Sequence, residues 1–169
     1  SLLPEASFRE ATINASGWPV LAYTRASNGT ILRIYEYLNM KENDRIELFW
    51  QGNDGLYGTG TDIAAATLTP TYDVKAEDLQ PKDDRLDDDP NRPPNPVLKV
   101  FVDFEVSYDE IKKIKPSGGG PGTEAYGSAW VYYTVTANLG AGADNTSETD
   151  RTVATHKPLV ISARPPTKP

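Results

Sequence analysis

The chain has 169 residues, a net charge of −7 at pH 7 and a hydrophobic content of 38%, values typical of one globular domain with a sizeable core. No run of about 18 apolar residues occurs, so we expect no insertion into a membrane. The absence of cysteine excludes disulfides, thiol nucleophiles and thiolate metal sites. Residues 73–89 hold eight acidic and three basic side chains, and without a basic patch we expect no nucleic acid partner.

Alternation of apolar and polar residues is the main structural signal, and it predicts half-buried strands of antiparallel sheets. In chain order we expect strands at 18–24, 30–37, 45–51, 61–69, 97–107, 130–136 and 151–162. The first two flank Asn28-Gly29, a pair typical of a hairpin connection. Pro158 interrupts the last strand, which suits a sheet edge or a bulge.

Three of these segments alternate most clearly. The residues expected in the core are Ile46, Leu48 and Trp50; Leu98, Val100, Val102, Phe104 and Val106; and Val131, Tyr133 and Val135. Aromatic side chains also fall on the opposite, polar faces, namely Phe49, Phe101, Trp130 and Tyr132. Such exposed aromatic residues need either a partner or a cover.

The segments between the strands are mostly loops. Residues 107–115 are the one helical candidate, with Ser107 and Glu110 in the spacing of a capping box. Residues 70–96 form a long acidic and proline-rich loop, and residues 164–169 a proline-rich tail or linker. We therefore expect a single domain over residues 1–163.

The order of three motifs resembles the immunoglobulin-like modules of large bacterial surface and secreted proteins, the invasin- and adhesin-type arrays. The matching stretches are "NDRIELFWQG" (43–52), "VDFEVSYDEI" (102–111) and "VYYTVTANLGAGADNTS" (131–147). The resemblance covers most of the chain except residues 57–96. It implies an all-β, immunoglobulin-like antiparallel β-sandwich with a short helical corner before the penultimate strand and no inherited catalytic residues.

On this reading, Trp50 fills the centre of the sandwich, and Val135 with its neighbours takes the place of the usual disulfide. Immunoglobulin domains also carry a tyrosine two residues before the second cysteine, which hydrogen-bonds to the backbone. Tyr133 holds the equivalent place before Val135. We expect its hydroxyl to fix the helical corner, and we expect the indole N–H of Trp50 to find a partner.

Two groups of residues are candidates for binding. If the strands at 30–37 and 45–51 pair, their outward side chains form an exposed aromatic and arginine face, made of Arg33, Tyr35, Tyr37, Arg45 and Phe49. The alternative is that residues 57–96 fold over this face and bury it. Loop aromatics at positions 18, 57 and 126 are of the kind that stack on sugars.

The acidic loop offers oxygen ligands of the kind that calcium prefers. The candidates are Asp83, Asp84, Asp87, Asp88 and Asp89. The competing interpretation is a solvated acidic loop that needs no cofactor.

Catalytic patterns are weak. His156 is the only histidine and has no serine in a nucleophile elbow to activate, so we assign it a structural role. Carboxylates are abundant, but they lie in one hydrophilic run or on outward positions, which does not favour a glycoside hydrolase.

The leading hypothesis is therefore a non-catalytic binding or spacer module of a secreted or cell-surface bacterial protein. Its partners are a protein or glycan on a cell surface, or neighbouring modules of the same chain. The alternative is a carbohydrate-binding or toxin-associated module that targets a host surface.

Overall fold

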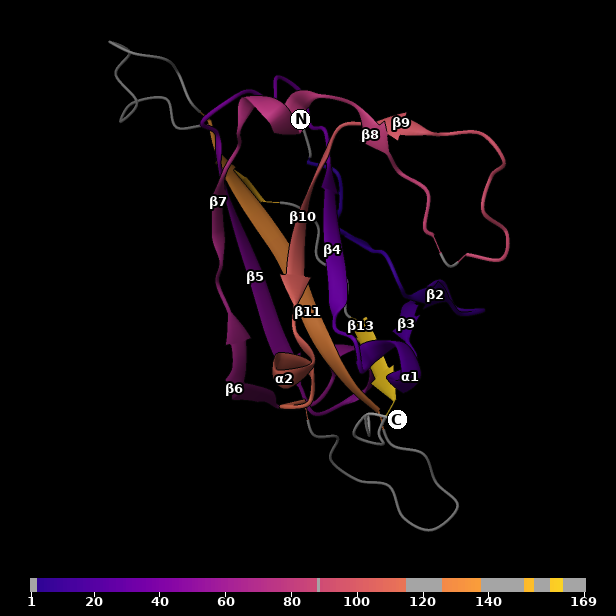
Figure 1. The fold of residues 1–169 in the computed structure, drawn as a ribbon. Coiled ribbons are helices and arrows are strands. Elements are labelled where there is room, and N and C mark those ends of the chain that lie inside the picture. Colours follow the sequence, from indigo (N-terminus) through magenta and orange to yellow (C-terminus); the bar gives the residue numbers. More distant parts are fainter. Residues whose placement is uncertain (1–2, 88, 115–125, 138–150, 154–158, 163–169) are drawn as a thin grey trace.

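Two larger antiparallel sheets and one small strand pair make up most of the structure, a computed structural model that describes residues 3–87, 89–114, 126–137, 151–153 and 159–162 (Figure 1). Asp88, a candidate calcium ligand, and His156, expected in a structural role, lie outside the described residues. No helix in the described part of the chain combines the length and hydropathy that a membrane span requires.

The first sheet has the order β1-β4-β10. Its strands are β1 (Ser7–Phe8), β4 (Thr30–Tyr35) and β10 (Phe101–Val106). The alternation predicted within β10 is confirmed, because Val102, Phe104 and Val106 are buried. The same expectation is wrong for Leu98, which is 63% exposed. Leu98 belongs to β9, a separate short strand that leaves the core.

The second sheet has the order β2-β3-β13-β11-β5-β6, with β12 beside β11 and β7 beside β5. Its strands are β2 (Thr12–Ile13), β3 (Pro19–Leu21), β5 (Arg45–Asn53), β6 (Asp62–Leu68), β7 (Thr71–Asp73), β11 (Tyr126–Thr136), β12 (Arg151–Val153) and β13 (Leu159–Ser162). The predicted closing strand is thus two strands, which pair with opposite ends of β11 along the edge that β5 does not occupy. The pairing of β13 with β3 is parallel, and the other pairings described are antiparallel.

The apolar faces of the two sheets share one hydrophobic core, and β4 and β10 lie in front of β5 and β11 in Figure 1. Trp50 of β5 is 1% exposed and lies opposite Val131 of β11. Its indole N–H has no hydrogen-bond partner among the described residues, so the expected partner is not found. The core position predicted for Trp50 is confirmed.

Tyr133 is fully buried in the same core, as its alternation predicted. Its hydroxyl donates a hydrogen bond to the carbonyl oxygen of Pro4. The expectation that this hydroxyl fixes the helical corner is therefore wrong. It ties the start of the described chain to the second sheet instead.

The predicted hairpin at Asn28-Gly29 is also wrong, because β3 and β4 belong to different sheets. A single helical turn, α1 (Tyr23–Ala26), separates them and carries the chain from one sheet to the other. Gly29 ends this connection with a φ of +81°, and a Cβ there would lie 2.7 Å from the carbonyl oxygen of Val106. Glycine suits this position because it readily adopts a positive φ and has no Cβ to collide with the carbonyl oxygen of Val106.

The helical corner is α2 (Tyr108–Ile111), which directly follows β10. Ser107 caps it without a side-chain hydrogen bond, so the capping box is not formed. The Glu110 carboxylate accepts a hydrogen bond from Lys113 at 2.9 Å instead. Buried Ile111 and Ile114 anchor the corner in the core.

The segment expected as one long loop contains regular structure. Besides β7, it holds the short helix η2 (Ala76–Leu79) and β8 (Lys82–Asp83), which pairs with β9 (Leu98–Lys99). Another short helix, η1 (Leu56–Gly58), follows β5. The β8–β9 pair closes the loop at its base and fixes where its acidic residues lie.

Candidate functional site

The structure divides the predicted aromatic and arginine face between two sheets. Arg33 and Tyr35 belong to β4, whereas Arg45 and Phe49 belong to β5, and these strands do not pair. Tyr37 is only 6% exposed, and its hydroxyl donates to an Asp44 carboxylate oxygen at 2.7 Å. Arg45 is exposed and pairs with Asp73 at 3.1 Å. These five residues therefore do not form one surface.

Arg33 and Tyr35 are covered by the acidic loop of residues 70–96. This agrees with the alternative prediction that residues 57–96 fold over these side chains. One oxygen of the Asp84 carboxylate accepts a hydrogen bond from Arg33 at 2.9 Å and from the Tyr35 hydroxyl at 2.7 Å. The Arg33 guanidinium also lies over the Phe101 ring, with its Cζ atom 3.6 Å from the ring centroid. Arg33 also holds both oxygens of Asp103, at 2.8 and 3.0 Å.

The charges in this cluster are mutually satisfied. Burial disfavours the charged form of Asp84, but hydrogen bonds from Tyr35 and Arg33 and the positive charges of Arg9 and Arg33 outweigh it and lower its pKa. Burial likewise opposes the charge of Arg33, but the hydrogen bonds to Asp103 and Asp84 raise its pKa above the usual value. These contacts therefore attach the acidic loop to the first sheet. The Asp84 carboxylate is occupied by hydrogen bonds to other side chains of the protein.

The other predicted calcium ligands are dispersed. Asp83 accepts hydrogen bonds from Arg85, which lower its pKa, and lies 3.8 Å from Arg92. Asp87 is almost fully exposed, and an Asp89 oxygen accepts a hydrogen bond from the backbone N–H of Asn91. Among the described residues, no group of three or more histidine or acidic side chains is placed to hold a metal ion.

A different set of aromatic residues gathers on the outer face of the second sheet. Phe49 of β5 lies directly opposite Tyr132 of β11. Their rings are stacked, with centroids 4.5 Å apart and planes 11° apart. Both side chains are partly exposed, because the alternation that buries Trp50 and Tyr133 turns them to the other face.

A second stack lies at the other end of this face. Trp18, just before β3, stacks on Tyr57 of η1, with centroids 4.6 Å apart and planes 22° apart. The Tyr57 hydroxyl accepts a hydrogen bond from the Asn14 side chain at 2.9 Å. Tyr57 has a φ of +54°, a left-handed conformation that is uncommon for a bulky residue and marks a position held by its surroundings.

Trp130 lies between the two stacks. It is two residues from Tyr132 on the same face of β11, and its indole N–H donates to the carbonyl oxygen of Gly58 at 3.3 Å. A Cβ at Gly58 would lie 2.2 Å from the Trp130 ring, so only glycine allows this contact. The Ser128 hydroxyl holds η1 in place. It accepts a hydrogen bond from the Gly58 N–H at 2.7 Å and donates one to the Gly55 carbonyl oxygen at 2.7 Å.

We call these five partly exposed side chains the aromatic row. Its members are Trp18, Tyr57, Trp130, Tyr132 and Phe49. The sequence indicated Phe49 as a binding residue, but grouped it with arginine and tyrosine residues that lie elsewhere. It also indicated Trp18 and Tyr57 as loop aromatics, without predicting that they stack on each other. Trp130 and Tyr132 were missed as site residues, although the alternation in residues 130–136 already placed both outward.

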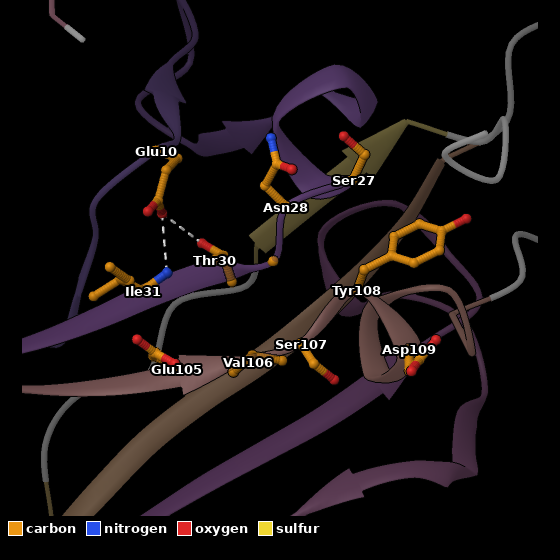
Figure 2. A pocket seen from close by; sticks show the side chains of 11 residues that line it. Glu10, Ser27, Asn28, Thr30, Ile31, Glu105, Val106, Ser107, Tyr108 and Asp109 are labelled. Carbon is orange, nitrogen blue, oxygen red and sulfur yellow. Dashed lines mark hydrogen bonds between the residues drawn. The ribbon is translucent and has the colours of Figure 1, made fainter. Parts of the chain in front are cut away.

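A cavity of about 600 Å³ lies at one end of the first sheet, where β4 begins and β10 ends (Figure 2). Carboxylates and hydroxyls line it, and Glu10 there accepts hydrogen bonds from the Thr30 hydroxyl and the Ile31 N–H at 2.8 and 3.0 Å. These bonds fasten the start of β4 to the segment after β1. The cavity is separate from the aromatic row.

Comparison with models of protein families, with curated proteins and with solved structures finds no match to this chain.

Proposed function

We propose that this chain is a non-catalytic binding module of a secreted or cell-surface bacterial protein, and that it contacts its ligand through the aromatic row. The proposed architecture is an immunoglobulin-like sandwich of the two larger sheets. The shared core supports this architecture, since Trp50 and Val135 lie in one cluster with side chains from β4 and β10.

The observation that carries the function is the position of the row. Five aromatic side chains keep part of their surface in water, although each ring costs free energy when it is exposed. Aromatic residues concentrated in one patch are enriched at recognition surfaces. Among the described residues, the first sheet offers no comparable aromatic surface, because Arg33 and Tyr35 there are covered by Asp84.

The test is binding of the fluorescently labelled chain to intact bacterial and animal cells. We expect the unaltered chain to bind one of these surfaces and the variant Phe49→Ala/Tyr132→Ala to lose at least tenfold in affinity. These rings lie on the outer face, so circular dichroism and the melting temperature should show that the variant remains folded.

A matched control is Tyr108→Ala, which removes a partly exposed aromatic side chain that lines the cavity and does not belong to the row. It should bind as the unaltered chain does. Absence of binding to every surface, or equal binding by the Phe49/Tyr132 variant, would contradict the proposed function.

A further inference from the structure

We propose that the ligand of the aromatic row is an extended, uncharged polysaccharide chain. This inference rests on the proposed function and specifies the chemistry of its ligand. Sugar rings present flat C–H faces that pack on aromatic rings, and their edges carry hydroxyl groups. A ligand of this kind requires flat, fixed rings with neutral polar groups between them.

The rings are fixed before any ligand arrives. The Phe49–Tyr132 and Trp18–Tyr57 stacks hold four rings in near-parallel pairs. Asn14 fixes the Tyr57 hydroxyl, and the Gly58 carbonyl fixes the Trp130 indole. A ligand therefore orders few side chains on binding, which removes a cost that otherwise reduces affinity.

Several side chains beside the rings are neutral and polar, although Glu47, two residues from Phe49 on the same face of β5, is acidic. Gln51 is the cross-strand partner of Trp130 and accepts a hydrogen bond from Thr67 at 2.8 Å, so that an amide and a hydroxyl border the row. Thr134 follows Tyr132 on the same face of β11. Amide and hydroxyl groups both donate and accept hydrogen bonds, which matches the hydroxyl edges of a sugar.

Charge selects against anionic ligands. The chain carries a net charge of −7, and the nearest arginine on this face of β5, Arg45, is already paired with Asp73. An anionic glycan or lipid headgroup would meet repulsion without an available cationic partner at that position. An uncharged polysaccharide does not meet this electrostatic repulsion.

The extent of the row indicates a polymer. Trp18 lies beside β3 and Phe49 lies on β5, three strand positions away in the order β3-β13-β11-β5. With about 4.8 Å between neighbouring strands, the row crosses roughly 14 Å of sheet. This distance exceeds a single sugar ring, so that the row can contact several sugar rings of one polysaccharide.

The experiment measures retention of the purified chain on insoluble cellulose and chitin by sedimentation, and on soluble xylan and β-glucan by affinity electrophoresis, with heparin as the anionic comparison. We expect retention on at least one neutral polysaccharide and none on heparin. Phe49→Ala/Tyr132→Ala should weaken retention at least tenfold, whereas Tyr108→Ala should leave it unchanged.

Tryptophan fluorescence gives an independent readout, since Trp18 and Trp130 lie in the row while Trp50 is buried. The retained polysaccharide should protect the two row tryptophans from acrylamide quenching. Retention on none of the neutral polysaccharides, or equal retention by the Phe49/Tyr132 variant, would overturn the inference. If cell binding still requires the row in that case, the proposed function stands and only the polysaccharide assignment fails.

Discussion

At the scale of single residues, Trp50 shows how the core does without a disulfide. Its side chain is almost fully buried at the centre of β5, between the two sheets. Because its indole N–H has no partner among the described residues, the contribution of Trp50 comes from packing and apolar burial. The ring therefore stabilises the fold as a large apolar group.

Replacing Trp50 with alanine should lower the free energy of unfolding by about 3–5 kcal/mol, as expected for a large aromatic side chain removed from a packed core. Trp50→Phe should cost less, because it retains a ring and loses an N–H that makes no hydrogen bond. Urea unfolding followed by circular dichroism measures both. A Trp50→Ala variant as stable as the parent would show that the core does not depend on this residue.

At the scale of elements, the acidic segment is fastened to the first sheet through Asp84. The Asp84 carboxylate is partly buried and accepts hydrogen bonds from Arg33 and Tyr35, and the backbone carbonyl of Asp84 accepts a hydrogen bond from the Arg9 side chain. The β8–β9 pair brings Asp84 to this place, since it follows β8 directly. The Asp84 carboxylate thus fixes the position of the acidic loop against the first sheet.

Asp84→Asn should lower the free energy of unfolding by about 1.5–3 kcal/mol at pH 7, the range for hydrogen bonds to charged groups. The pKa of Asp84 is lowered in the folded chain, so its contribution is complete above the ordinary aspartate pKa of about 3.9 and is lost as pH falls through the lowered value. Urea midpoints between pH 7 and pH 2 measure this loss.

The matched control is Asp87→Asn, because Asp87 is 97% exposed on the same segment. It should change stability little at any pH. Equal effects of the two substitutions on the free energy of unfolding at pH 7 would show that Asp84 does not hold the segment.

At the scale of the whole molecule, the two sheets depend on each other through one core. Tyr37 lies just beyond β4, and Tyr133 lies on β11, yet the two side chains belong to the same buried cluster. Burial raises the pKa of both phenols, and for Tyr37 the hydrogen bond to Asp44 raises it further. Ionisation of either side chain is therefore strongly disfavoured while the sheets remain packed.

Of the nine tyrosines, Tyr37 and Tyr133 should therefore ionise only when the chain unfolds. Their folded pKa values are raised, so the stability they contribute is complete below about pH 10 and is lost as pH rises above it. Tyrosinate absorbance and circular dichroism should change together in one alkaline transition. Ionisation of these two tyrosines before loss of the circular dichroism signal would contradict the shared core.

In β5, β10 and β11, the sequence by itself determined which side of the strand a residue occupies. The period of two placed Trp50, Tyr133 and Val135 in the core and Phe49, Trp130 and Tyr132 outside it, because neighbouring side chains of a strand point to opposite faces. It also predicted the short helical corner after β10.

Only the tertiary structure decided which strands share a sheet and which loops cover a face. Alternation carries no information about the partner of a strand, so it left open whether β4 pairs with β5, and the structure places these strands in different sheets. Asp84 lies 51 residues from Arg33, and Tyr57 lies far from Trp18 along the chain. Both contacts arise from long-range packing of the whole chain, so that the covered arginine face and the aromatic row became visible only in three dimensions.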